Sequence, residues 1–186
     1  MGTHRTAWLV VALASAAGLV FTAIQIVERI AILKDPASSL LCDVNGVVSC
    51  STVLGAWQSS VILGIPNAFI GAVMFGMFLA TGLAGLLGTA FPRAFLLTVL
   101  GLVVFFAAFA TWFMIQTAFV IGALCLWCVG IVTAVALIGA ALTHTSATAA
   151  PPGSRLALLD RAGISALVWL GWWVAVLGLV AVGLLS

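Results

Sequence analysis

Long apolar stretches separated by short polar segments run through the whole chain. A helix needs roughly 20 apolar residues to cross the hydrocarbon core of a bilayer. Stretches of about this length predict transmembrane spans at residues 8–27, 66–87, 94–115, 118–142 and 164–185. A helix satisfies its own backbone hydrogen bonds, so helices are the structures that such segments form in lipid. The pattern predicts an all-α integral membrane protein with five transmembrane helices.

The third and fourth spans share one uncharged stretch. No Asp, Glu, Lys or Arg occurs from Ala94 to Ser154. Its apolar part is too long for one helix and fits two helices, with a turn near Gln116-Thr117. Residues 143–163 follow, and their first part is rich in Thr, Ala and Pro, which predicts a flexible cytoplasmic connector. His144 at its edge is expected to be solvated.

Composition agrees with a membrane location. Of 186 residues, 65% are hydrophobic and 5% are charged, and the mean hydropathy is +1.39. Soluble domains average about 25% charged residues, so the chain is expected to lie in a lipid bilayer. The net charge of +2 is too small to indicate a nucleic-acid partner.

The basic residues near the span ends indicate an orientation, because cytoplasmic loops carry an excess of Lys and Arg. A cytoplasmic N-terminus places four basic residues inside and two outside. The inner residues are Arg5, Arg93, Arg155 and Arg161, and the outer ones are Arg29 and Lys34. This topology puts the polar loop of residues 33–60 and the C-terminus outside the cytoplasm.

Four cysteines, arranged in two pairs, carry most of the available chemistry. Cys42 and Cys50 lie in the 33–60 loop, and outside the cytoplasm a disulfide between them would persist. If this pair stood alone, a structural bridge or two inert thiols would be the favoured explanation, because most extracellular disulfides are structural. Asp43 is expected to disfavour the Cys42 thiolate by its charge.

Cys125 and Cys128 form the second pair, inside an apolar stretch. Residues three apart share a helix face, within the Cα separation of about 4.4–6.8 Å that a disulfide needs. Counted from the Gln116 turn, Cys125 is expected about 12 Å along the fourth helix, too far for the helix N-terminus to lower its pKa strongly. Zinc would want four ligands, and no His lies near the outer face. Redox use is therefore favoured, and no metal is expected.

These cysteines stand among residues that resemble the bacterial vitamin K epoxide reductase family. The matching residues are the run from Cys42 to Ser51, then Trp57, Gly64-Ile65-Pro66-Asn67, Ile70-Gly71 and Cys125-x-x-Cys128. The resemblance covers roughly residues 20–140. It implies a four-helix catalytic bundle around a quinone, here residues 1–142, in a bacterial plasma membrane. A fifth helix is found in many bacterial members.

The resemblance also implies roles for the four cysteines. Cys42 would take electrons from an extracytoplasmic thioredoxin-like thiol protein. Cys50 would exchange with Cys125, and Cys128 would face the quinone, which could be menaquinone or ubiquinone. Thiol–disulfide exchange requires access of a thiolate to a sulfur, which a mobile loop would provide.

Three residues are expected at the quinone. The family uses an Asn at the position of Asn67 to hydrogen-bond a quinone carbonyl, although an Asn after Pro66 could instead cap the second helix. Val132 stands where the animal enzymes have a quinone-binding Tyr. This difference fits simple quinone reduction better than epoxide reduction. Trp57 could cover the pocket or anchor the loop at the membrane interface.

The resulting hypothesis is a quinone-dependent thiol oxidase that supports disulfide formation. One alternative is vitamin K quinone or epoxide reductase activity. Another is an unrelated four-helix thiol oxidase, although that family places its Cys-x-x-Cys early in an outer loop. A non-enzymatic scaffold with a structural loop disulfide is the third, and it leaves Cys125 and Cys128 without a purpose.

Other apolar features are expected to be structural. The small residues Ala80, Ala84 and Gly88 suggest a helix-packing stripe. Three tryptophans in the last span are expected to pack or to face lipid, and they are Trp169, Trp172 and Trp173.

Overall fold

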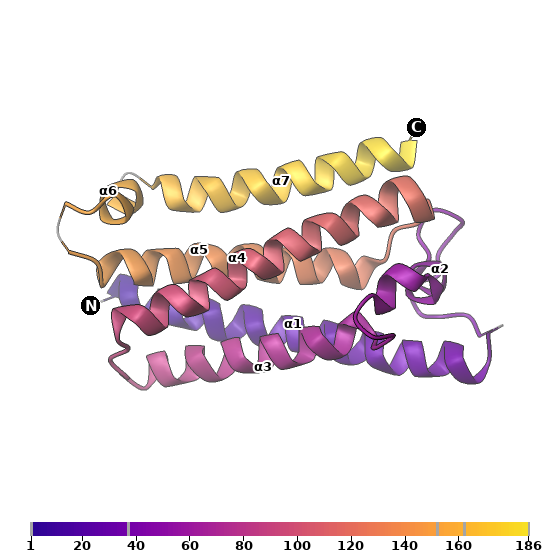
Figure 1. Cartoon of the computed structure of the whole chain (residues 1–186), viewed down its shortest axis with the longest axis horizontal. Coiled ribbons are helices and arrows are strands. Elements are labelled where there is room, and N and C mark those ends of the chain that lie inside the picture. Colours follow the sequence, from indigo (N-terminus) through magenta and orange to yellow (C-terminus); the bar gives the residue numbers. More distant parts are fainter. Residues whose placement is uncertain (1, 37, 152, 162, 186) are drawn as a thin grey trace.

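The computed structural model describes residues 2–36, 38–151, 153–161 and 163–185. Within them, five helices are long and apolar enough to cross a membrane, and they pack side by side with alternating direction (Figure 1). They are α1 (Gly2–Lys34), α3 (Asn67–Leu86), α4 (Arg93–Gln116), α5 (Leu126–Thr148) and α7 (Ile164–Leu185). The prediction of an all-α membrane fold is confirmed. The cysteine loop and the C-terminus lie at one end of the bundle, and the N-terminus lies at the other (Figure 1).

Prolines and glycines set the helix boundaries. Pro66 and Pro92 are the N-cap residues of α3 and α4. Proline is tolerated at a helix start because the backbone N–H that it lacks would have no partner within the helix there. Gly88 follows α3 with a φ of 89°, a left-handed conformation that glycine adopts at low cost. The chain therefore reverses cleanly between α3 and α4.

The turn between the third and fourth spans lies later in the chain than the sequence predicts. Gln116 ends α4, but the helix continues as a π-helical turn, η2 (Thr117–Ile121). Thr117 is buried, and its hydroxyl donates 2.7 Å to the Met114 carbonyl, so its polarity is satisfied inside the helix. The reversal comes at Gly122, with a φ of 72°, and α5 begins only at Leu126. The cysteine pair therefore lies at the start of its helix.

Close packing brings α1 against α3 and α5. A Cβ at Gly82 would lie 2.8 Å from the backbone nitrogen of Ala12, and one at Gly85 would lie 2.2 Å from the Trp8 ring. The glycines at these two positions thus allow α1 to approach. The stripe expected at Ala80, Ala84 and Gly88 is not the packing face, because Ala80 and Gly88 are exposed.

The last helix, α7, is held to the bundle by hydrogen bonds as well as by apolar contact. Each of its three tryptophans donates its indole N–H to a threonine on α4 or α5. The pairs are Trp169 to Thr143 at 3.0 Å, Trp172 to Thr111 at 2.9 Å and Trp173 to Thr133 at 3.0 Å. Val176 and Val180 of α7 join the apolar cluster around the cysteines.

The connector between α5 and α7 contains more helix than its composition predicts. α5 extends to Thr148, and a short helix, α6 (Arg155–Arg161), follows. His144 is not simply solvated, because its Nδ1 lies 2.8 Å from Oδ2 of Asp160. The other oxygen of Asp160 accepts a hydrogen bond of 2.6 Å from Ser165. Asp160 thus links the end of α5 to the start of α7.

Candidate functional site

Backbone pairing holds the cysteine loop against the start of α5. The Leu124 N–H donates 2.7 Å to the Val47 carbonyl, and the Ser49 N–H donates 3.0 Å to the Leu124 carbonyl. The second bond connects the residue before Cys125 to the residue before Cys50, and the first connects Leu124 to Val47 in the same loop. Because Cys125 directly follows Leu124 and Cys50 directly follows Ser49, this pairing brings the outer and inner cysteine pairs together.

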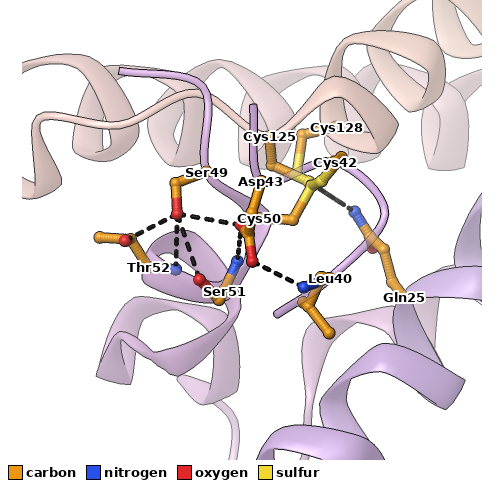
Figure 2. Close-up of a disulfide and its surroundings, with 10 residues drawn as sticks. All are labelled: Gln25, Leu40, Cys42, Asp43, Ser49, Cys50, Ser51, Thr52, Cys125 and Cys128. Atoms are coloured by element: carbon orange, nitrogen blue, oxygen red, sulfur yellow. Dashed lines mark hydrogen bonds between the residues drawn. A yellow bond between two sulfur atoms is a disulfide. The ribbon is translucent and has the colours of Figure 1, made fainter. Parts of the chain in front are cut away.

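Asp43 organises the same loop from within. Its carboxylate accepts hydrogen bonds from the N–H groups of Leu40 at 2.8 Å and Ser51 at 3.0 Å, and from the Ser49 hydroxyl at 3.1 Å (Figure 2). Burial opposes its ionisation, but the backbone and hydroxyl donors outweigh burial and lower the pKa of Asp43. The carboxylate therefore stays charged and fixes the segment that contains both loop cysteines. These hydrogen bonds differ from the sequence-based expectation, which concerned only the charge of Asp43 beside Cys42.

The four cysteines form one buried group. Cys42 and Cys50 make a disulfide, with their Cα atoms 5.6 Å apart, while Cys125 and Cys128 are free thiols. The Cys125 Sγ lies 3.0 Å from the Cys50 Sγ, and the sulfurs of Cys42, Cys50 and Cys125 all lie within 4.8 Å of one another (Figure 2). In the disulfide state, Cys42 and Cys50 have no thiolate to offer a metal. The contact between the Cys125 thiol and the Cys50 sulfur of the disulfide suits thiol–disulfide exchange.

The inner thiols lie at the N-terminus of α5. Cys125 is the N-cap residue, and its carbonyl accepts from the Cys128 N–H at 3.1 Å. A hydrogen bond from the Cys128 thiol lowers the pKa of Cys125, and the N–H groups of Cys128 and Trp127 act in the same direction against burial. The expectation that Cys125 lies about 12 Å along the helix is wrong, because α5 begins later than the polarity of Gln116 indicated.

Gln25, a residue that sequence reasoning missed, contacts both inner thiols. It belongs to α1 and is 5% exposed. Its Nε2 lies 3.1 Å from the Cys128 Sγ and 3.8 Å from the Cys125 Sγ (Figure 2). The available signal was a polar side chain inside a predicted span, which is costly in a membrane unless it has a partner or a function.

A cavity among α1, α3, α4 and α5 adjoins this group. Cys128, Val132, Asn67 and Gln25 line it together with three phenylalanines of α4, Phe106, Phe109 and Phe113. The structure thus brings two of the three predicted quinone-binding residues to the cavity that Cys128 faces. Trp57 is 69% exposed and lies outside its lining.

Asn67 does not cap α3, because Pro66 holds the N-cap position. Its Nδ2 instead donates 2.7 Å to the Gln58 carbonyl in η1 (Trp57–Ser60). Its Oδ1 is buried and has no hydrogen-bond partner among the described residues. The Asn67 side chain therefore connects the loop to α3, and its Oδ1 still lacks a hydrogen-bond donor among the described residues.

Arg29, one turn beyond Gln25, also lines the cavity. Its Nη1 donates 2.5 Å to the Leu54 carbonyl of α2 (Cys50–Gly55), which ties α1 to the helix that begins with Cys50. Its Nε is buried and has no partner in the part of the chain that the structure describes. From the sequence, Arg29 was expected only to mark the outer side of the membrane.

Comparison with known proteins agrees with this geometry. No individually curated protein sequence matches the chain. The family model described as the vitamin K epoxide reductase family matches residues 9–143, a wider range than the expected residues 20–140. That range contains all four cysteines, Gln25, Arg29 and the cavity residues of α3, α4 and α5. The chain, a multi-pass membrane oxidoreductase with two cysteine pairs in contact, belongs to the vitamin K epoxide reductase family.

Proposed function

We propose that the protein is a quinone-dependent thiol oxidase that supports extracytoplasmic disulfide formation. The observation that carries this proposal is the 3.0 Å contact between the Cys50 and Cys125 sulfurs. It joins a loop disulfide to a dithiol that borders an apolar cavity. A purely structural loop disulfide would not need a free thiol against one of its sulfurs.

The relay begins with a thioredoxin-like protein dithiol that reduces the Cys42–Cys50 disulfide and becomes oxidised itself. The Cys50 thiolate then attacks Cys125 in an oxidised Cys125–Cys128 pair. The Cys50–Cys125 bond forms, and Cys128 leaves with the electron pair. Attack of Cys42 on Cys50 restores the outer disulfide and releases Cys125. Two electrons have then moved from the partner to the inner pair, which matches the disulfide and thiols in the structure.

The cavity fits a quinone by its chemistry. Aromatic rings from α4 form an apolar wall, and the polar side chains of Gln25, Arg29 and Asn67 line the same cavity as Cys128. Asn67 keeps one N–H beyond the bond to Gln58, and the Nε–H of Arg29 has no partner among the described residues. A bound quinone supplies an acceptor for two electrons and two protons. Asn67 and Arg29 would hold its oxygens, with Val132 against the ring, and Trp57 remains a prediction.

The orientation in the membrane and the preferred electron acceptor follow from the basic residues and from the residue at position 132. With the N-terminus on the cytoplasmic side of a bacterial plasma membrane, the cysteine loop meets its thiol partner outside the cytoplasm. Val132, in place of a tyrosine, favours quinone reduction over epoxide reduction. Menaquinone and ubiquinone share the ring oxygens that these donors recognise.

A reconstituted assay tests the proposal. Purified protein is mixed with a reduced thioredoxin-like protein and a short-chain quinone, and both quinol and partner disulfide are measured. We expect equal amounts of the two products. Oxidation of the partner without quinol, or no oxidation by any quinone, would reject the proposed function.

A further inference from the structure

Gln25 contacts the inner thiols from a different helix. Its Nε2 lies 3.1 Å from Cys128 Sγ and 3.8 Å from Cys125 Sγ, and the side chain is 5% exposed. An amide nitrogen is a donor with no acceptor capacity, so it can only give hydrogen bonds to the sulfurs. The shorter distance identifies Cys128 as its main acceptor.

The relay places a negative charge on that sulfur. When Cys50 attacks Cys125, the Cys50–Cys125 bond forms, the Cys125–Cys128 bond breaks, and the electron pair remains on Cys128 as a thiolate. Cys128 is 6% exposed and lies in an apolar cluster. A buried charge is costly unless a hydrogen bond compensates for the lost water. Thus the leaving sulfur needs a donor from the protein.

Among the described residues, no hydrogen bond joins Arg29 or Glu28 to the Cys128 sulfur. Arg29 donates from Nη1 to the Leu54 carbonyl, and the proposed function assigns its unpartnered Nε–H to the quinone. Glu28, three residues beyond Gln25, is buried, and its carboxylate would repel a thiolate rather than stabilise one. A neutral amide can stabilise the thiolate without adding a second buried charge.

We propose that Gln25 is a further catalytic residue, which stabilises the Cys128 thiolate by an Nε2–H···S hydrogen bond each time the inner disulfide opens. This inference rests on the proposed relay. It adds a role in α1 for a residue outside both cysteine segments. It also gives a function to a polar side chain that lies in the apolar span just before Glu28.

The test isolates Cys128 from the other thiols. In the full-length chain with Cys42→Ala, Cys50→Ala and Cys125→Ala, the rate of Cys128 alkylation by iodoacetamide is measured at fixed pH with and without Gln25→Met. Methionine has a similar size and no N–H donor. We expect the rate to fall by about tenfold or more, because hydrogen bonds to charged groups are the stronger class. Thiolate absorbance near 240 nm should fall in parallel, and this signal does not depend on reagent access.

Ser15→Ala is the matched control. Ser15 is a buried polar residue of the same helix, about 15 Å from Gln25 along its axis, and its change should leave the alkylation rate unchanged. If Gln25→Met fails to insert, Gln25→Leu replaces it. Alkylation and absorbance within twofold of the parent would overturn the role of Gln25. No quinone or partner takes part, so that result would leave the proposed function standing.

Discussion

Replacing Asp43 with alanine should loosen the loop that presents Cys50 to Cys125. The change removes three hydrogen bonds, from the Leu40 and Ser51 N–H groups and from the Ser49 hydroxyl. The carboxylate is half-buried, so about 1 kcal/mol is assigned to each bond, below the range for fully buried charged groups. The free energy of opening the loop should therefore fall by about 3 kcal/mol. This corresponds to a roughly hundredfold larger population of molecules in which the loop is detached from the start of α5.

Amide hydrogen exchange measures this loss directly. The informative amides are those of Ser49 and Leu124, because they bond to backbone carbonyls rather than to Asp43. If the loop opens as one unit, both should exchange about a hundredfold faster in Asp43→Ala. Val44→Ala, at the exposed neighbouring position, is the control and should change neither. Exchange within twofold of the wild type at both amides would refute the organising role of Asp43.

The same carboxylate predicts a pH dependence. The folded pKa of Asp43 is lowered, so its contribution to loop stability is complete above the unfolded pKa of about 3.9. It is lost as the pH falls through the lower, folded pKa. Protection factors at Ser49 and Leu124 should therefore be constant from neutral pH to about pH 5 and should decrease below about pH 4. Asp43→Asn should remove that acid-dependent decrease, and its persistence would assign it to another group.

Three further changes test other parts of the site. Cys128→Ala should abolish quinone reduction while membrane insertion stays near wild type, and retained turnover would contradict the relay. Asn67→Ala should slow single-turnover quinone reduction by several-fold to about a hundredfold and leave Cys50–Cys125 exchange intact, whereas normal quinone kinetics would remove Asn67 from the site. Trp173→Phe deletes one bond to Thr133 and should lower the unfolding free energy by about 0.6 kcal/mol, measured by thermal unfolding. An unchanged stability would show that this bond does not help to hold α7.

The sequence predicted the five spans and the two cysteine pairs because both are local patterns. Apolar length decides whether a segment spans the membrane, and the spacing of Cys125 and Cys128 is visible in four residues. The turn at Gly122 was missed because Thr117 looked like a loop residue. Its hydroxyl is satisfied inside the helix by Met114, a contact that polarity alone does not reveal.

The missed parts of the site depend on contacts between distant segments. Gln25 lies 100 residues before Cys125, and their proximity results from the packing of α1 against α5. The pairing of Val47 with Leu124 is equally nonlocal, and backbone groups leave no mark in the sequence. Asp43 was interpreted from its neighbour Cys42, whereas its main partners are Leu40, Ser49 and Ser51. The chemical character of these side chains was predictable from the sequence, but the residues that they contact were not.

Trapping the exchange between the two cysteine pairs tests the central claim most directly. In Cys42→Ala, the cysteine that releases Cys50 from Cys125 is absent, so the relay should stop at a Cys50–Cys125 disulfide. The protein is oxidised by a short-chain quinone, its free thiols are blocked, and its peptides are mapped by mass spectrometry without reduction. We expect Cys50 joined to Cys125, with Cys128 blocked as the free thiol. Cys50 joined to Cys128, or a free Cys50 beside an intact Cys125–Cys128 disulfide, would contradict the relay.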